Sequence, residues 1–335
     1  MKSFSYATAA SIEDATNADG TSVMRIAGGT ELLNWIRLGI SAPDVVVDVG
    51  RIPGLDRIER NEDQLVIGGL ATLNAVGEND LVRWHAKVLS EACLKAAAPQ
   101  VRNRATLAGN VLQKTRCEYF RSETPLPWPC NKRYPETGCA ARNGVNHRHA
   151  IFGWTAACVA TQPSDPAVAL ACLDAEVEVQ GKNGRRLIPM TGFHVTQQEA
   201  AAASRDEARY ETQLAPDEII IAYHLKVREG ERSAYLKIRE RESYEYALVS
   251  AAAAVTLDGG TILAARIALG SVAQKPWRLT ATERALTGAA LSKEALASAV
   301  EAGMRDACPL AHNGYKIAMA KNAAVRALLL AGGAA

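Results

Sequence analysis

The stretch AGGTELL, residues 27–33, follows a short apolar run and opens a helical pattern. The run before it, Val23–Ile26, predicts a strand, and the apolar spacing after it predicts an amphipathic helix capped by Thr30. Two adjacent glycines let the backbone turn tightly and expose its N–H groups, which suits a phosphate cradle. By itself the motif also fits a plain strand–helix turn, because its spacing is neither the GxGxxG fingerprint nor the Walker lysine loop.

Two later stretches offer further polar groups. Residues 103–110 read NRATLAGN, where Thr106 and Asn110 carry hydrogen-bonding side chains and Gly109 permits close backbone approach. The QPSD motif ends at Asp165, whose carboxylate can accept hydrogen bonds from the hydroxyls of a ribose or ribityl chain. Each stretch alone also fits a capped turn or a helix N-cap, so only their combination points to a binding site.

Residues 114–150 are rich in Pro, Cys, His and Arg and show no helix or strand period. A structureless stretch of this length inside a compact domain is usually functional or disordered. Nine Arg or Lys residues and three Asp or Glu residues fall between residues 101 and 150, so this part of the chain is locally positive.

Four cysteines in and just after this stretch are spaced C-x12-C-x8-C-x18-C: Cys117, Cys130, Cys139 and Cys158. Four thiolates suit a [4Fe–4S] cluster or a tetrahedral zinc ion. The lack of a tight CxxC knuckle disfavours zinc without excluding it. The nearby His147 and His149 are alternative ligands, whereas Cys93 and Cys172 lie in apolar patterns that predict core positions.

The composition is that of a globular protein with an ordinary core. The chain has 335 residues, of which 48% are hydrophobic and 22% charged, which leaves room for two or three domains. Lys and Arg total 38 against 36 Asp and Glu, so the net charge of +2 gives no reason to expect a nucleic-acid partner. We also expect no membrane span and no export signal, because the sequence shows no long apolar run, apolar signal core or twin arginine.

Hydrophobic periodicity predicts a mixed α and β chain. The expected strands are residues 23–26, 45–49, 64–69, 175–180, 219–227, 234–238, 247–257 and 262–270. The expected helices are residues 32–38, 81–98, 167–173, 279–286, 293–306 and 315–330, with Pro99 ending the second of them. The charged residues 229–232 suggest a domain boundary.

In order, AGGTELL, NRATLAGN, QPSD and a strand carrying Tyr235-Leu236-Lys237 resemble the flavoprotein subunit of the xanthine dehydrogenase, aldehyde oxidase and carbon monoxide dehydrogenase family of molybdenum hydroxylases. The resemblance covers essentially the whole chain. It implies an α+β fold with a two-lobed FAD-binding domain of the vanillyl-alcohol-oxidase (PCMH) type over residues 1–228. A C-terminal α+β domain with a three-stranded sheet and helices would follow over residues 229–335.

The same resemblance implies which residues contact FAD. Around the pyrophosphate it places Ile26, Ala27, Gly28, Gly29, Thr30, Glu31, Leu32, Leu33 and Asn34. It places Thr106, Gly109 and Asn110 at the phosphate and ribityl region, Asp165 on a sugar hydroxyl, Ile220 in the pocket wall and Lys237 near the flavin ring. A cation there would tune the flavin's electronics. The family's substrate chemistry lies on another chain, so no catalytic residue is expected here.

The insert, about residues 114–160, resembles the iron–sulfur variant of this subunit in bacterial periplasmic-type aldehyde oxidoreductases. The resemblance implies one [4Fe–4S] cluster on the four cysteines; 4-hydroxybenzoyl-CoA reductase also carries a cluster insert, with different cysteine spacing. The implied complex has a large subunit with the molybdenum cofactor, which oxidises aldehydes to carboxylic acids, and a small subunit with [2Fe–2S] clusters. This chain would take electrons from the [2Fe–2S] subunit onto FAD and pass them to an external acceptor.

Three alternatives stay open at this point. The chain can be the flavoprotein subunit of another molybdenum hydroxylase, of the xanthine dehydrogenase or 4-hydroxybenzoyl-CoA reductase type. It can be a solo flavin or iron–sulfur redox protein, or a zinc-stabilised interaction module without redox function. For the complex we expect either the cytoplasm or the periplasm, the latter by co-export on a partner's signal.

Overall fold

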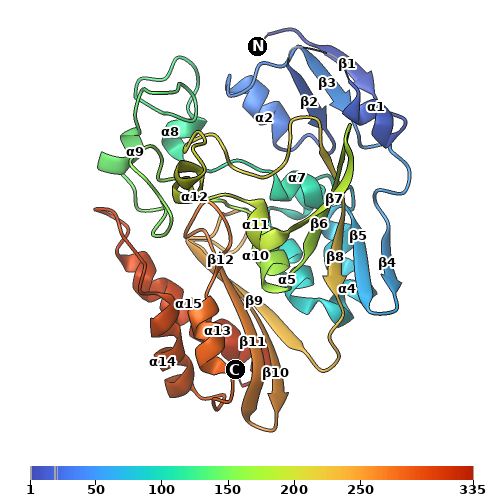
Figure 1. Ribbon diagram of the computed structural model, residues 1–335. Helices are drawn as coiled ribbons and strands as arrows, with labels where there is room; N and C mark the ends of the chain where they lie inside the picture. Colours follow the sequence, from blue (N-terminus) through green and yellow to red (C-terminus); the bar gives the residue numbers. More distant parts are fainter. Residues whose placement is uncertain (1, 19, 21, 335) are drawn as a thin grey trace.

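The computed structural model describes residues 2–18, 20 and 22–334. The described residues form three sheets (Figure 1), with strand orders β1-β3-β2, β4-β5-β8-β6-β7 and β12-β11-β10-β9. The strands are β1 (Ser5–Thr8), β2 (Val23–Ile26), β3 (Val45–Asp48), β4 (Ile58–Asn61), β5 (Gln64–Gly68), β6 (Glu176–Gly181), β7 (Gly184–Pro189), β8 (Ile219–Lys226), β9 (Arg232–Ile238), β10 (Val249–Asp258), β11 (Thr261–Gly270) and β12 (Trp277–Arg278).

Helices cover and connect these sheets. They are α1 (Ile12–Thr16), α2 (Leu32–Arg37), α3 (Leu73–Glu78), α4 (Asp80–His85), α5 (Lys87–Lys95), α6 (Pro99–Arg102), α7 (Leu107–Val111), α8 (Glu118–Arg121), α9 (Ala140–Asn143), α10 (Asp165–Cys172), α11 (Met190–Phe193), α12 (Gln197–Ala202), α13 (Thr280–Leu286), α14 (Lys293–Gly303) and α15 (Tyr315–Gly332). No helix of the described part is both long and apolar enough to cross a lipid bilayer.

The first sheet is parallel and buries side chains on both faces. Neighbouring residues of β3 point to opposite sides, as the strand period requires. Val46 packs with Leu32 and Ile36 of α2, whereas Val47 packs in a cluster that contains Ile219 and Ile221 of β8. The glycine loop at residues 27–31 therefore leaves a strand that is anchored between α2 and the second sheet.

A bulge in β8 lets side chains of this strand pack in two different hydrophobic cores. Glu178 pairs with Ala222 but Val179 pairs with Ile220, so Ile221 is an extra residue in the ladder. The extra residue shifts the phase of the side chains, so Ile220 joins the main core while Ile221 packs towards the first sheet. The bulge thus turns Ile220 towards the side of the sheet where α7 lies.

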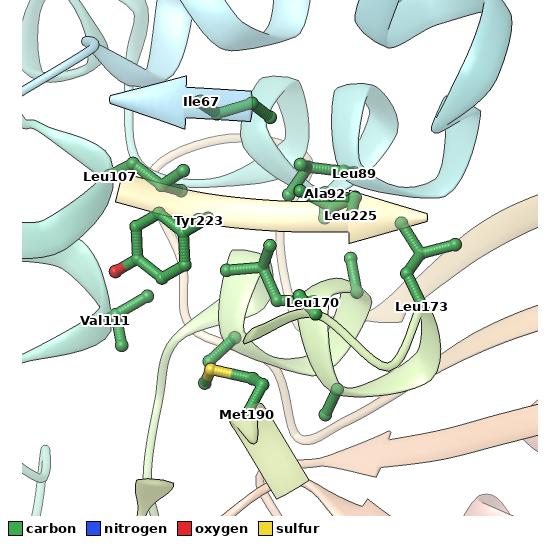
Figure 2. Close-up of a cluster of buried hydrophobic side chains, with 14 of the residues drawn as sticks. Ile67, Leu89, Ala92, Leu107, Val111, Leu170, Leu173, Met190, Tyr223 and Leu225 are labelled. Carbon is green, nitrogen blue, oxygen red and sulfur yellow. The ribbon is translucent and has the colours of Figure 1, made fainter. Parts of the chain in front are cut away.

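The main core lies between the second sheet and helices of the first domain. Figure 2 shows Leu107 and Val111 of α7 and Leu170 of α10 around the ring of Tyr223. All four side chains are fully buried. Burial of apolar surface stabilises by about 25 cal/mol per Å², so this core fixes α7 and α10, the two helices whose first turns carry the sequence motifs.

Alternating small residues let the third sheet separate two cores. Ala251 and Ala253 of β10 face the C-terminal core with helices α13 to α15, while Ala252 and Ala254 face the main core. Alanine on both faces allows helices to approach closely from both sides. The C-terminal sheet is consequently packed against the first domain by α5 and α10.

The α+β architecture agrees with the expectation, and each expected strand is present within about two residues of its predicted bounds. Two details differ. The expected helix 81–98 is broken at Ala86, whose φ of −143° is extended, and Pro99 begins α6 instead of only ending a helix. The C-terminal sheet also gains β12, a two-residue edge strand beside the three long ones.

Candidate functional site

The glycine loop packs directly onto the NRATLAGN stretch. A Cβ atom on Gly28 would lie 1.8 Å from the carbonyl oxygen of Arg104, so only glycine fits there. Gly29 adopts a φ of +75°, a left-handed conformation that side chains with a Cβ rarely take. The fold thereby joins two motifs that are far apart in the sequence.

The loop presents backbone donors without protein acceptors. Within the described residues, no hydrogen bond is donated by the backbone N–H groups of residues 28–31. Successive free N–H groups in a tight turn form a concave anion site, which fits the pyrophosphate of FAD. The predicted cap is absent, however, because Glu31 occupies the N-cap position of α2 and no side chain caps it.

The NRATLAGN stretch is fixed by its own cap and by the second sheet. Thr106 Oγ1 accepts a hydrogen bond of 3.1 Å from the Gly109 N–H, which leaves the Thr106 hydroxyl hydrogen free to donate. Ala108 donates its N–H to the carbonyl of Gly69 at 3.0 Å. Ile220 lies next to Gly69, since a Cβ on Gly69 would be 2.5 Å from the Ile220 carbonyl oxygen.

The QPSD motif contacts this stretch through side chains. Ser164 caps α10 by accepting from the Ala167 N–H, and its hydroxyl donates to Asn110 Oδ1 at 2.7 Å. Asp165, the first residue of α10, is thereby held beside the second motif. The three motifs predicted from the sequence thus form one continuous site.

Asp165 of this site forms a buried ion pair with Lys237 of β9. Lys237 Nζ lies 2.7 Å from Asp165 Oδ2, and the two side chains are 1% and 6% exposed. Tyr235 donates its hydroxyl to the other carboxylate oxygen at 2.6 Å. Asp165 and Lys237 were each expected to contact FAD separately, but in the structure they form a buried ion pair. Tyr235, for which the sequence predicted no role, also binds this carboxylate.

Glu31 links the glycine loop to the cysteine-rich insert. Its carboxylate accepts hydrogen bonds from Arg116, at 2.9 Å, and from Arg121. Burial alone would raise the pKa of Glu31, but the two guanidinium groups outweigh it and hold the pKa below its ordinary value. The Glu31 side chain thus faces the insert, and the neighbouring Leu33 side chain, also expected at FAD, is 54% exposed.

The four predicted cysteines of the insert line a single pocket. Other residues that line this pocket are Tyr119, Phe120, Pro129, Asn131, Lys132, Ala140, Ala141, Ala157, Val159 and Ala160. Cys130 and Cys139 face each other in a short bridge, and Cys158 forms a tight turn with Thr155. All four are free thiols. By contrast, Cys93 and Cys172 are fully buried in the main core, which confirms that prediction.

The backbone around the pocket points donors at the sulfurs. Burial raises the pKa of Cys117, Cys130 and Cys139, while backbone N–H groups that donate to each sulfur act in the opposite direction. Among the residues that the structure describes, the buried Nε atoms of Arg116 and Arg148 and Nδ1 of His149 find no hydrogen-bond partner. In the described residues no group of three or more His, Cys, Asp or Glu side chains is arranged to hold a metal ion.

Charged anchors hold the insert to the rest of the molecule. Glu211 binds Lys132 at 2.7 Å and also Lys114, both from the insert. Burial would raise the pKa of Glu211, but the two ammonium groups lower it to about 2. Arg133 donates to the carbonyls of Leu38 and Gly39, at 3.2 Å each, just after α2. Figure 1 shows the insert, drawn in green with α8 and α9, next to the N-terminal lobe.

The sequence and the fold match known proteins over nearly the whole chain. The FAD binding domain in molybdopterin dehydrogenase matches residues 2–225, and the CO dehydrogenase flavoprotein C-terminal domain matches residues 234–331. The chain belongs to the FAD-binding subunits of the molybdenum hydroxylases. The three motifs all lie within the residues that match the FAD binding domain.

Two related subunits and one solved structure illustrate the similarity of this molybdenum hydroxylase subunit to known proteins. It is 41% identical over 299 residues to the aldehyde oxidoreductase FAD-binding subunit PaoB of Escherichia coli K12, covering 88% of this chain and 87% of that protein. It is 26% identical to the carbon monoxide dehydrogenase medium chain of Hydrogenophaga pseudoflava over 92% of this chain and 89% of that protein. A solved structure of carbon monoxide dehydrogenase from Hydrogenophaga pseudoflava superposes with a TM-score of 0.76 at 26% identity, covering 99% of this chain and 98% of that chain.

Several contacts of this FAD subunit had no clear signal in the sequence. Arg116 and Arg121 fell in a positive stretch without a named acidic partner, and Glu211 stood in a loop with no motif. Their pairing depends on the tertiary fold, because Glu31 and Glu211 come from segments far from the insert. Tyr235 was visible as the first residue of its motif, since an alternating strand position predicts a side chain on the same face as Lys237.

Proposed function

We propose that this chain is the FAD and [4Fe–4S] electron-transfer subunit of a molybdenum-containing aldehyde oxidoreductase. One observation supports it above the others: four free cysteines line one pocket in an insert that is salt-bridged to the FAD loop through Glu31. The relative with 41% identity, PaoB, is named as the FAD-binding subunit of an aldehyde oxidoreductase.

The cysteine pocket favours a cluster over zinc. The four irons of a cubane each take one cysteine at a separate corner, whereas one zinc ion draws all its ligands to a common centre. The four cysteines line one pocket, and their spacing lacks the CxxC knuckle that is usual at structural zinc sites. Backbone N–H groups that donate to the sulfurs of Cys117, Cys130 and Cys139 would supply positive potential for an anionic cluster.

The residues of the chain would position the two groups. Residues 28–31 would bind the FAD pyrophosphate through backbone N–H groups, and Thr106 would donate its free hydroxyl hydrogen to the phosphate or ribityl region. Asp165 can still accept a hydrogen bond from a sugar hydroxyl, because a carboxylate offers about four lone-pair sites and Tyr235 and Lys237 use two. The bound FAD and cluster supply the redox chemistry, taking electrons from a [2Fe–2S] partner and passing them to an external acceptor.

The proposed partners are a large subunit with the molybdenum cofactor, which oxidises aldehydes to carboxylic acids, and a small subunit with [2Fe–2S] clusters. The chain itself would hold no substrate site. For location we propose the cytoplasm, or the periplasm after co-export with a partner that carries a signal.

Anaerobic purification from the source organism tests the proposal. We expect this chain to co-purify with two further subunits, and we expect an added aldehyde to bleach the visible band of its flavin. A chain that purifies alone and turns over substrate by itself would support the solo redox protein instead. A complex whose flavin is reduced by purines but not by aldehydes would support the xanthine dehydrogenase type.

A further inference from the structure

A histidine lies against one of the four pocket cysteines. The Nε2 atom of His149 is 3.2 Å from Cys117 Sγ, and the His149 side chain belongs to a residue that is only 6% exposed. A cysteine bound to iron has lost its proton, so its sulfur can only accept a hydrogen bond. In the cluster-bearing protein the hydrogen must therefore sit on Nε2 of His149.

The C-terminal domain holds this histidine in place. Asn313 Nδ2 and Lys316 Nζ, at the start of α15, donate to the His149 carbonyl oxygen at 3.1 and 3.0 Å. Both residues are fully buried. Lys316 also donates to the carbonyl of Ser271, at 2.5 Å, so it joins the insert to the end of β11. These bonds fix the backbone that carries the imidazole.

The ring itself has little freedom. The aromatic ring of Tyr119 packs against it with centroids 6.4 Å apart. Tyr119 is held in turn, since its hydroxyl accepts from the Val145 N–H at 2.8 Å. The other ring nitrogen, Nδ1, is buried without a partner, so the contact with Cys117 is the only hydrogen bond of the imidazole within the described residues.

We propose that His149 acts on the [4Fe–4S] cluster through Cys117: its Nε2–H donates to the ligand sulfur and makes the cluster easier to reduce. The inference rests on the cluster assigned under the proposed function. Reduction adds one electron to the cluster and no bond is made or broken, so the extra negative charge falls partly on the sulfurs. An N–H dipole directed at a sulfur stabilises the more negative state and raises the reduction potential.

The first test uses the unaltered complex with ¹⁵N-labelled histidine. The complex is reduced with dithionite, and pulsed EPR of the reduced cluster measures the hyperfine coupling to nitrogen. We expect a weak coupling, as for a nitrogen that reaches iron only through a hydrogen bond to sulfur. A strong coupling would mean that His149 ligates iron directly, and no coupling would mean that the hydrogen bond is absent; either result overturns the inference.

The second test compares variants by EPR-monitored redox titration. His149→Phe removes the donor, and we expect its cluster potential to be more negative than that of the wild type. His149→Gln keeps an N–H near the Nε2 position and should restore most of the shift, a rescue that a purely structural role would not give. His147→Gln is the matched control, because within the described residues only the backbone carbonyl of His147 makes a side-chain hydrogen bond, to Tyr315, and its potential should equal that of the wild type.

The outcomes separate this inference from the proposed function. Wild-type protein without iron and sulfide would contradict the cluster itself. Full iron content with an unchanged potential in His149→Phe would contradict only the role of His149. If His149→Phe loses iron, His149→Gln and the labelled wild type still decide the matter.

Discussion

Gly29 and Gly28 are required at the FAD loop for different reasons. Gly28 lacks space for any side chain because of Arg104, whereas Gly29 needs its left-handed φ of +75°. We predict that Gly29→Val, which costs roughly 1–3 kcal/mol in backbone strain, displaces the free N–H groups and yields a flavin-poor protein. The flavin content per folded chain measures this.

The matched control for this prediction is Gly230→Val. Gly230 has nearly the same φ, +72°, and no atom within 4 Å of its absent Cβ. It should incur a similar strain and keep its FAD. If both variants retain full flavin, the assignment of residues 28–31 to the pyrophosphate is wrong.

The buried pair of Asp165 and Lys237 gives a second prediction. Removing one partner, in Asp165→Asn or Lys237→Met, should destabilise the protein by about 3–5 kcal/mol, because the other polar group stays buried without compensation. The double variant should lose less than the sum of the two, as expected for residues in direct contact. Urea unfolding of the wild type, the two single variants and the double variant measures the four free energies of this double-mutant cycle.

The same variants report on the cofactor. Loss of the Asp165 charge should weaken FAD binding by about 1.5–3 kcal/mol, and loss of Lys237 should change the reduction potential of the bound FAD. The exposed pair Lys321 and Glu301, with side chains 32% and 63% exposed, is the control for the stability cycle and should contribute less than about 1 kcal/mol. Unchanged affinity and potential in the variants of the buried pair would contradict both roles at the flavin.

At the scale of elements, the insert has little hydrophobic core of its own. Its two helices, α8 and α9, are single turns, and few of its side chains belong to the main hydrophobic cores. A bound cluster would act as its core, because metal binding supplies folding free energy. We predict that replacing any one of Cys117, Cys130, Cys139 or Cys158 with Ser loses iron and exposes residues 114–150 to proteolysis.

Such variants should keep FAD, since the glycine loop is folded by β2 and α2. Cys93→Ala and Cys172→Ala are the controls, because both thiols lie in the main core, and they should keep their iron. Iron analysis and limited proteolysis give the two readouts. Retention of iron in all four Ser variants would be incompatible with the assigned ligands.

Glu211 makes the anchoring of the insert pH-dependent. The pKa of Glu211 lies near 2 in the folded protein against an ordinary value of 4.5, so its stabilisation is complete above about pH 4.5 and is lost as the pH falls towards 2. We predict that Glu211→Gln lowers the free energy of unfolding at pH 7 by about 3 kcal/mol, and that the difference from wild type shrinks between pH 4.5 and 2.

Denaturant unfolding at several pH values measures the Glu211 effect. Glu301→Gln serves as control, since its carboxylate is 63% exposed and should contribute little at any pH. A Glu211→Gln deficit that stays constant down to pH 2 would show that the carboxylate is not held ionised by Lys114 and Lys132.

The elements also show what the sequence could predict. Apolar runs and strand periods predicted β2, β3, β10 and β11, because these depend on local sequence patterns. The break at Ala86 was missed, since nothing in the local sequence opposes a helix there; it separates α4 from α5, whose side chains pack in the main core. The bulge at Ile221 was missed for the same reason, because two cores on opposite faces of β8 impose it.

At the candidate site, too, the sequence predicted local motifs but not the contacts that depend on the tertiary fold. The sequence predicted which motifs meet, because their order matches a known family, but not the pairing of Asp165 with Lys237 or of Glu31 with the insert. Side-chain partners across segments far apart in the chain depend on the tertiary fold. The hydrogen bond of His149 to Cys117 belongs to this class as well.

At the scale of the whole molecule, the insert contacts both domains. It is bound to the FAD-type domain through Glu31 and Glu211, and to the C-terminal domain through Lys316 and through Glu245, which lies 3.3 Å from Arg148. An iron–sulfur cluster in this insert would therefore lie at the junction of the FAD loop and the C-terminal domain. This placement suits a chain that collects electrons from a partner and delivers them to its flavin.

The central claim is that one chain holds both FAD and a [4Fe–4S] cluster. Quantification of iron, acid-labile sulfide, zinc and FAD in the full chain, purified without oxygen and separated from its partners, tests it most directly. The account predicts about four irons and four sulfides for each FAD, and no zinc. One zinc per chain without sulfide, or FAD with neither metal, would contradict it.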